Sequence, residues 1–215
     1  MSTSDGVRDA HRRLGRLHVL TDADGGPRAL DVVAAAVAAG APVVQVRAKG
    51  CTDRVLHDFA RAVVEICRAA GTTCLVNDRV DVALAVGADG THLGEHDLPL
   101  AAARRVAGPG HLLGGTARDP ERARRLVAEG ADYLGVGPAY PTTTKTGLPD
   151  ALGPGGVRLV AGAVDVPVIA IGGVTAARVG GLLEAGAHGV AVVGAVTGAA
   201  DPAAAVRELL GALGR

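Results

Sequence analysis

The stretch "AEGADYLGVG", residues 128–137, contains the end of a predicted helix, a turn and the start of a predicted buried strand. The same order of residue types recurs in three other places: "AAGAPVVQVR" (38–47), "AVGADGTHLG" (85–94) and "EAGAHGVAVVG" (184–194). In each phrase a helix-like stretch ends at Gly-Ala, and glycine there suits the left-handed residue that turns a helix toward a strand. The intervals between the phrases are long enough for two strand–helix units each. The four glycines are Gly40, Gly87, Gly130 and Gly186.

Four further apolar stretches between these phrases predict four more strands, which makes eight: residues 17–21, 72–77, 111–116 and 166–173. Helical periodicity separates them, for example over 52–70 after Thr52 as a helix N-cap, and over 119–129. Alternating strands and helices predict an α/β protein with parallel strands, and eight such units close into a single (β/α)8 TIM barrel. An open doubly wound sheet is the alternative, but the G-x-G-x-x-G fingerprint is missing after the first strand.

The composition limits the function classes. The chain has 215 residues, enough for one large core, and we expect a flexible lead over 1–14 followed by one barrel domain over 15–215. Lys plus Arg and Asp plus Glu both total 22, and aromatics are 1%, so neither nucleic acid nor a base-stacking surface is indicated. The N-terminus lacks a signal-peptide centre and no stretch predicts a membrane span, so we expect a cytoplasmic protein. A homo-oligomer stays open.

Cysteine usage predicts neither a disulfide framework nor a zinc site. Cys51, Cys67 and Cys74 are an odd, widely spaced set without a C-x-x-C pair. Cys67 falls on an apolar helical face, which predicts a packing role.

Polar residues follow nearly every predicted strand, and the carboxyl ends of barrel strands are where active sites form. Gln45, Arg47 and Lys49 alternate after the second strand and would point the same way. Lysines and threonines at other strand ends suit an anion, Gly172-Gly173 before a helix suits a phosphate, and aspartates suit Mg2+. These other candidates are Asn77, Asp78, His92, Asp97, Thr116, Thr142, Thr144, Lys145, Gly173, Val193 and Gly194.

Structural roles explain each of these residues when it is taken alone. Asp78 and Asp97 precede helical stretches and could be N-caps, and Gly-Gly is often a tight turn. Lys145 could be a solvated loop residue, and the Gln45–Lys49 face could pair with neighbouring carboxylates. A histidine such as His92 at a strand end is usually a hydrogen-bonded core residue. A shared location at one end of the barrel favours a functional rim instead.

Four segments resemble the thiamine phosphate synthase family, also called thiamine-phosphate pyrophosphorylase, in order and over about residues 17 to 210. The N-D-R-x-D-x-A and P-T-x-T-K blocks are the specific ones. The segments are "VVQVRAKG" (43–50), "VNDRVDVALAVGADGTHLGEHDLP" (76–99), "DYLGVGPAYPTTTK" (132–145) and "VIAIGGV…GVAVVGAV" (168–174 and 189–196).

This resemblance implies a transferase of the thiamine-phosphate diphosphorylase type. It would couple 4-amino-5-hydroxymethyl-2-methylpyrimidine diphosphate with a thiazole phosphate, giving thiamine phosphate and diphosphate by a dissociative carbocation mechanism. Mg2+ would be held by Asp78 and Asp97. Lys145, Arg47 and Lys49 would be catalytic. The pyrimidine diphosphate would contact Gln45, Arg47, Lys49, Asn77, Thr116 and Lys145. The thiazole phosphate would contact Thr142, Thr144, Gly173, Val193 and Gly194.

The chain departs from the family pattern at three positions. Glu95 replaces a frequent glutamine, Gly194 a common serine, and Thr116 a usual serine. A thiazole tautomerase of the same superfamily is the nearest alternative function, but its histidine after the fifth strand is missing in "GGTARD" (114–119). A regulatory barrel that binds a thiamine precursor, or a general phosphate-binding isomerase, would not need the combination of aspartates and lysines.

Overall fold

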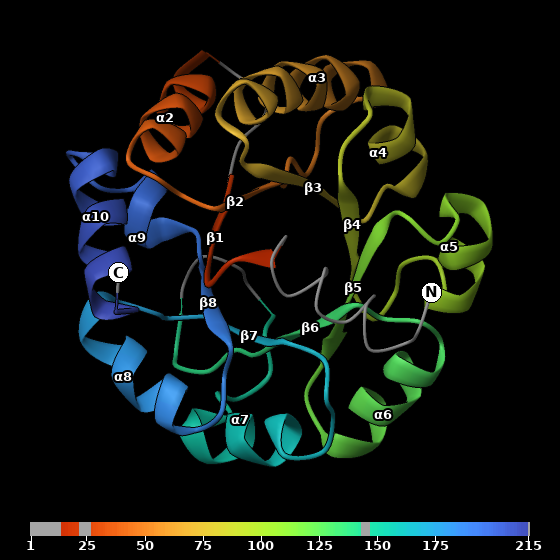
Figure 1. The fold of residues 1–215 in the computed structure, drawn as a ribbon, viewed down its shortest axis with the longest axis vertical. Coiled ribbons are helices and arrows are strands. Elements are labelled where there is room, and N and C mark those ends of the chain that lie inside the picture. The colour runs from red at the N-terminus through yellow and green to blue at the C-terminus, as the bar shows by residue number, and fades with distance from the viewer. Residues whose placement is uncertain (1–13, 22–26, 143–146, 215) are drawn as a thin grey trace.

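Eight parallel strands form a closed barrel surrounded by helices (Figure 1). The computed structural model describes residues 14–21, 27–142 and 147–214. The strands are β1 (Leu17–Leu20), β2 (Val43–Val46), β3 (Thr73–Asn77), β4 (Gly90–Leu93), β5 (Leu112–Ala117), β6 (Tyr133–Val136), β7 (Val168–Ile171) and β8 (Gly189–Val192). The helices are α2 (Pro27–Ala38), α3 (Asp53–Ala70), α4 (Val80–Val86), α5 (Leu100–Ala107), α6 (Pro120–Ala128), α7 (Gly153–Ala161), α8 (Ala176–Glu184), α9 (Gly194–Thr197) and α10 (Pro202–Ala212). The predicted (β/α)8 barrel is confirmed, and the alternative prediction of an open doubly wound sheet is wrong.

Strand order follows chain order, and the pairing of β1 with β8 closes the ring. The glycines of the four repeated phrases all have positive φ, with values of 92°, 68°, 99° and 89° in chain order, as predicted. Helix α3 begins after Thr52, whose Oγ1 accepts a hydrogen bond from the Val55 amide at 3.4 Å. One boundary differs from the prediction: β2 ends at Val46, so Arg47 and Lys49 lie in the loop that follows.

Side chains alternate between the barrel interior and the helix layer, as the period of a strand requires. Outward-facing Val44 and Val46 pack with Phe59 and Val63 of α3, and Cys67 is buried there as predicted. Burying one such side chain fully contributes about 1.5–3 kcal/mol. The inward-facing residues form a separate inner core: Leu14, Leu20, Val43, Leu75, Leu112, Tyr133, Ile169 and Ala191.

Two glycines on inward-facing strand positions make room for the largest interior rings. A Cβ atom on Gly114 would overlap the Tyr133 ring, and one on Gly135 would lie 2.8 Å from Cε1 of His92. Glycine is therefore needed at both positions to let a ring cross the barrel interior.

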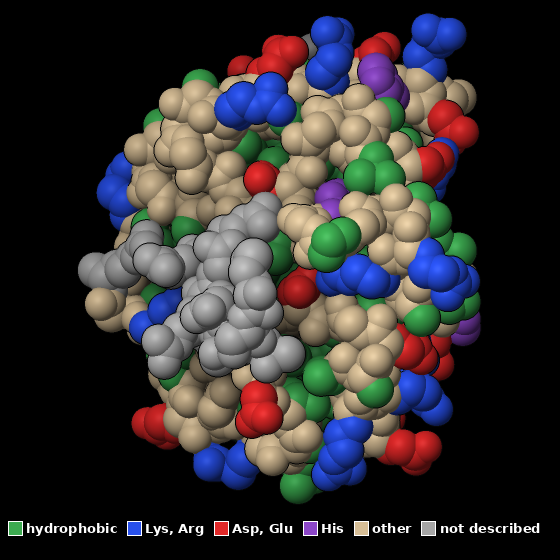
Figure 2. Space-filling model, turned by 45° about the vertical axis from the view of Figure 1, so that its right-hand side comes forward, with side chains coloured by type: hydrophobic (Ala, Val, Ile, Leu, Met, Phe, Trp, Pro, Cys, Tyr) green, Lys and Arg blue, Asp and Glu red, His purple; other side chains and the backbone are tan. Residues whose placement is uncertain are grey.

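The chain start and the surface lie outside the predicted site. Leu14, at the predicted boundary of the lead, is fully buried, and residues 1–13 lie outside the described ranges. On the face drawn in Figure 2, Lys and Arg side chains are interspersed with Asp and Glu side chains. Within the described ranges, none of the helices has the length and apolar character needed to cross a bilayer.

We expect Gly114→Ala to lower the free energy of unfolding by about 1–3 kcal/mol, because the added methyl group overpacks the barrel against Tyr133. Urea denaturation followed by circular dichroism measures this. Gly180→Ala in α8 is the control: its Cβ would meet open space, so the variant should be more stable by about 0.5–1 kcal/mol. Equal effects in the two variants would contradict this account of the interior.

Candidate active site

A pocket of about 700 Å³ lies at the carboxyl ends of the strands, and residues from all eight strand ends line it. This volume is typical of small-molecule sites. Every predicted site residue in the described ranges lines this one pocket: Gln45, Arg47, Lys49, Asn77, Asp78, Asp97, Thr116, Thr142, Gly173, Val193 and Gly194. Thr144 and Lys145 lie outside the described residues. The predicted convergence on one rim is therefore confirmed for the described residues, while their roles stay predictions.

Strand register and alternation turn four polar side chains toward the barrel interior. Asn77 of β3 is level with His92 of β4, and His92 is level with Gly114 of β5. Gln45 and Thr116 face inward at the ends of β2 and β5 by the same alternation. Gln45 is only 4% exposed, so its amide is available to the pocket and to its neighbours rather than to bulk water.

Arg47 is fixed through its backbone rather than by strand pairing. The Thr21 hydroxyl accepts a hydrogen bond from the Arg47 amide at 2.8 Å and donates one to the Arg47 carbonyl at 2.9 Å. The end of β1 thus supports the loop that carries Arg47 and Lys49.

Two carboxylates and one ammonium group meet at the pocket wall. Lys49 Nζ lies 3.4 Å from Oδ2 of Asp78, and the Asp97 carboxylate is close enough to affect the pKa of Asp78. Burial raises the pKa of Asp78, the neighbouring Asp97 raises it further, and Lys49 opposes both effects. The two carboxylates offer oxygen ligands to a cation at this part of the pocket.

The backbone at Asp78 is strained. Asp78 has a φ of 66°, the single positive value found for a non-glycine residue in the described ranges. The Arg79 amide donates to the Asn77 carbonyl at 2.8 Å, which closes a γ-type turn around Asp78, and the Asp78 amide donates to the His92 carbonyl at 2.8 Å. Such conformations cost of order 1–3 kcal/mol and cluster at functional sites.

The alternative of helix capping is wrong for both aspartates. The N-cap residues of α4 and α5 are Arg79 and Pro99, and neither helix start has a side-chain cap. Asp97 Oδ2 instead accepts a hydrogen bond from the Gly94 amide at 2.7 Å. This bond leaves the second oxygen of Asp97 for the pocket.

A buried polar network forms the pocket floor. His92 Nδ1 lies 3.1 Å from the Tyr133 hydroxyl, and His92 Nε2 lies 3.0 Å from Oγ1 of Thr116. The Gln45 side chain also interacts with Tyr133, which slightly opposes the effect of burial on the Tyr133 pKa. Burial lowers the pKa of His92 to about 4 and raises the pKa of Tyr133 far above its usual value, so both are neutral at pH 7. The network therefore orients the Gln45 amide and the Thr116 hydroxyl without adding charge.

Tyr133 and His18 also line the pocket and were not among the residues predicted from the sequence. His18 Nε2 bonds to the Leu14 carbonyl at 2.7 Å, and burial lowers the pKa of His18 to about 3. The sequence did contain a pattern that could have identified them, because each is a polar residue at an inward-facing position of a predicted strand. His92 itself is both a hydrogen-bonded interior residue and a pocket residue.

The opposite side of the pocket is built from glycine turns. Gly172 and Gly173 have φ values of 97° and 62°. A Cβ atom on Gly173 would lie 2.5 Å from the Pro141 carbonyl oxygen, so glycine allows the segment after β6 to lie against the end of β7. The Tyr140 amide donates to the Gly172 carbonyl at 3.0 Å in this contact. Backbone at Gly173 and at Gly194, where α9 begins, is thereby brought to the pocket wall.

The oxygen donors of Asp78 and Asp97 fit magnesium better than a transition metal. Within the described ranges there is no group of three or more His, Cys, Asp or Glu side chains arranged to hold a metal. Magnesium is commonly bound by one or two protein carboxylates together with water and substrate phosphates. Two adjacent carboxylates are a donor set of that kind.

Comparisons with known proteins agree on one family. The family model described as thiamine monophosphate synthase matches residues 17–196. The thiamine-phosphate synthase of Salinispora tropica is 59% identical over 93% of this chain and 98% of that protein. The thiamine-phosphate synthase of Moorella thermoacetica is 44% identical over 89% and 91% of the two chains.

Solved structures agree with the sequence relatives. The thiamine phosphate pyrophosphorylase from Pyrococcus furiosus superposes with a TM-score of 0.86 at 34% identity, covering 95% of this chain and 97% of that one. A 3-hexulose-6-phosphate synthase superposes with a TM-score of 0.67 at 22% identity over 92% and 99% of the chains, a likeness that extends to the fold alone.

We expect the neutral state of His92 to make stability depend on pH. Its pKa is about 4 in the folded protein and 6.5 as an ordinary value, so the unfolded chain binds one more proton between these pH values. Stability is therefore fully present above pH 6.5 and falls as the pH drops toward 4, by up to about 1.4 kcal/mol per pH unit for this group.

Urea denaturation of wild type and His92→Gln at a series of pH values measures this effect. The variant should lose less stability on acidification, whereas His57→Gln on the exposed surface should follow wild type. A difference between His92→Gln and wild type that is constant across pH would contradict the lowered pKa.

Proposed function

The chain belongs to the thiamine monophosphate synthase family, and we propose that it couples 4-amino-5-hydroxymethyl-2-methylpyrimidine diphosphate with a thiazole phosphate. The products would be thiamine phosphate and diphosphate. The chain is an enzyme of the transferase class. One observation supports the choice of substrates most: the Asp78, Asp97 and Lys49 cluster lies in the same pocket as the buried amide of Gln45 and the Gly173 turn.

The pyrimidine diphosphate would bind on the side of β2 to β5. The Gln45 amide, Asn77 and the Thr116 hydroxyl offer directional hydrogen bonds to the heterocycle, and the Tyr133–His92 network holds two of them in place. Arg47 and Lys49, with Lys145 outside the described residues, would contact the diphosphate. Donors held in fixed positions bind charge more strongly than mobile water does, because they need no reorganisation.

Asp78 and Asp97 are the residues that would hold Mg2+. A bound magnesium ion would neutralise charge on the diphosphate as it leaves.

The thiazole phosphate would bind on the side of β6 to β8. The backbone around Gly173, at the start of α8, and the Val193–Gly194 turn offer N–H groups to the phosphate. Thr142 lines this side of the pocket, and Thr144 would extend it. The serine hydroxyl common in the family at position 194 is replaced by glycine, so backbone donors would carry more of the binding here.

The residues suit a dissociative reaction. The pyrimidine amino group would push electrons toward the methylene carbon as the carbon–oxygen bond to diphosphate breaks. The thiazole nitrogen would then donate its electron pair to the carbocation and form the new carbon–nitrogen bond. Such a reaction needs charge stabilisation and close placement of the two substrates more than it needs acid–base groups. The neutral pocket floor of His92 and Tyr133 is consistent with that requirement.

A thiazole tautomerase is disfavoured by the end of β5. Ala117 and Arg118 follow Thr116 there, and the Arg118 guanidinium donates to the carbonyls of Gly137 and Asp150 at 3.0 Å and 2.8 Å. A guanidinium held by backbone carbonyls is not placed to exchange protons with a substrate.

The direct test mixes both precursors with the purified protein and MgCl2 and measures thiamine phosphate by chromatography and diphosphate by a coupled assay. We expect both products in equal amounts, and loss of activity with EDTA that returns with excess Mg2+. Activity that persists unchanged in EDTA would refute the metal proposal, and no thiamine phosphate under any condition would refute the function.

We expect Asp78→Ala and Lys145→Ala each to lower turnover by at least about a hundredfold, because each removes charge stabilisation from the leaving diphosphate. Asp165→Ala, which removes an exposed carboxylate away from the pocket, is the matched control and should retain wild-type turnover. Circular dichroism melts confirm folding of each variant. Turnover near wild type in folded Asp78→Ala and Lys145→Ala would refute the assigned site.

A further inference from the structure

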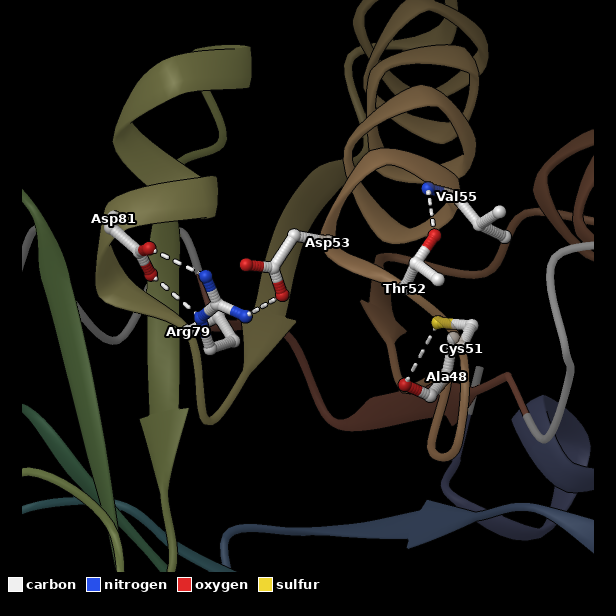
Figure 3. Close-up of polar contacts among 7 residues, drawn as sticks. All are labelled: Ala48, Cys51, Thr52, Asp53, Val55, Arg79 and Asp81. Atoms are coloured by element: carbon white, nitrogen blue, oxygen red, sulfur yellow. Dashed lines mark hydrogen bonds and ion pairs between the residues drawn. The ribbon is translucent and has the colours of Figure 1, made fainter.

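Arg79 joins the beginnings of two helices beside the pocket (Figure 3). Its Nε and Nη2 donate to the two carboxylate oxygens of Asp81 in α4, at 2.9 Å and 2.7 Å. Its Nη1 donates to Asp53, the first residue of α3, at 2.6 Å. The guanidinium thus uses its planar fork on one carboxylate and a third donor on another, a geometry that lysine cannot reproduce.

The backbone of the same residue closes the turn at Asp78. The Arg79 amide donates to the Asn77 carbonyl, while Asp78 between them has a φ of 66°. A positive φ at a non-glycine residue persists only where surrounding contacts hold it. The side chain of Arg79 supplies such contacts on the outer side of the turn, and the Asp78–His92 backbone hydrogen bond supplies one on the inner side.

The contact with Asp53 reaches the second loop of the site. Asp53 follows the segment after β2 that contains Lys49, and Lys49 pairs with Asp78 across the pocket wall. Arg79 therefore ties together, from outside, the two loops whose side chains form the Lys49–Asp78 pair. Arg79 itself is not among the described residues that line the pocket.

We propose that Arg79 is a positioning residue that holds Asp78 and Lys49 in register for a metal–diphosphate ligand without touching that ligand. This inference rests on the proposed function for the identity of the ligand. The two carboxylates are largely exposed, with 79% of Asp53 and 66% of Asp81 accessible, and 36% of Arg79 is accessible. Exposed ion pairs contribute little to global stability, so the effect of losing them is local to the turn.

Calorimetric titration with magnesium diphosphate at 0.15 M salt tests the proposal. We expect Arg79→Ala and Arg79→Lys to weaken binding by about tenfold or more, the usual effect of removing a group that orients metal ligands. Asp81→Asn should also weaken the binding of magnesium diphosphate, as the Arg79 variants do. Simple electrostatics gives the opposite sign for Asp81→Asn, because removing a negative charge near an anion site would strengthen binding.

The controls separate positioning from other causes. Arg125→Ala, which removes an exposed ion pair with Glu121 in α6, should bind magnesium diphosphate as wild type does. Wild-type affinity in Arg79→Lys would overturn the proposal in favour of charge alone. A lower melting temperature with unchanged affinity would overturn it in favour of a structural role alone.

Hydrogen exchange of the Arg79 amide gives a readout that does not depend on the ligand. This amide should lose protection at least about tenfold in Asp81→Asn while amides in β5 keep theirs. If wild type fails to bind magnesium diphosphate, the proposed function fails and the exchange data still judge the role of Arg79. Unchanged protection of the Arg79 amide would overturn that role.

Discussion

The pairing of β1 with β8 is the constraint on which the site depends. Leu17 is level with Val190 and His18 with Ala191, so segments from the two ends of the chain become neighbours. Since all eight strands run in the same direction, closure brings every carboxyl end to one rim. Gln45 and Gly194 then line the same pocket although most of the chain separates them. The (β/α)8 fold thus supplies the convergence, and the individual strand ends supply the chemistry.

The rim contains several arrangements that are unfavourable when taken alone. Asp78 faces a second carboxylate with its backbone in a left-handed conformation, and His92 is held neutral by burial. The buried apolar residues between the strands and the helices stabilise the fold and so offset these costs. Concentrating strain and like charge at one rim while the remainder packs conventionally is typical of a functional site. On the proposed function, a bound cation would offset the like charges of Asp78 and Asp97.

The sequence predicted the strands and the rim because both follow from short periods and local turn chemistry. The predicted strand ends placed Gln45 and Asn77 at the rim, and glycine marked the helix ends. Contacts that depend on side-chain reach across the fold were not predictable in this way. The role of Arg79 needs the starts of α3 and α4 to lie side by side, which no local pattern shows. The interpretation of Asp97 as a helix N-cap was wrong because its carboxylate accepts a hydrogen bond from the amide of Gly94, which precedes it in the chain. Local sequence does not show whether an aspartate will bond to a preceding or to a following amide.

The use of lysine and arginine separates two kinds of cation in this chain. Only Lys49 and Lys145 are lysines among the 22 basic residues, and both belong to the proposed diphosphate site. Several arginines fill structural roles with their planar fork; Arg104, for example, bonds to three backbone carbonyls and to Asp132, whereas Arg47 lines the pocket. An ammonium group is a compact charge with freely rotating donors, so it can follow an anion whose bonding changes during reaction. On the proposed function, the two lysines would follow the charge of the leaving diphosphate, and Arg47 would add a planar guanidinium beside them.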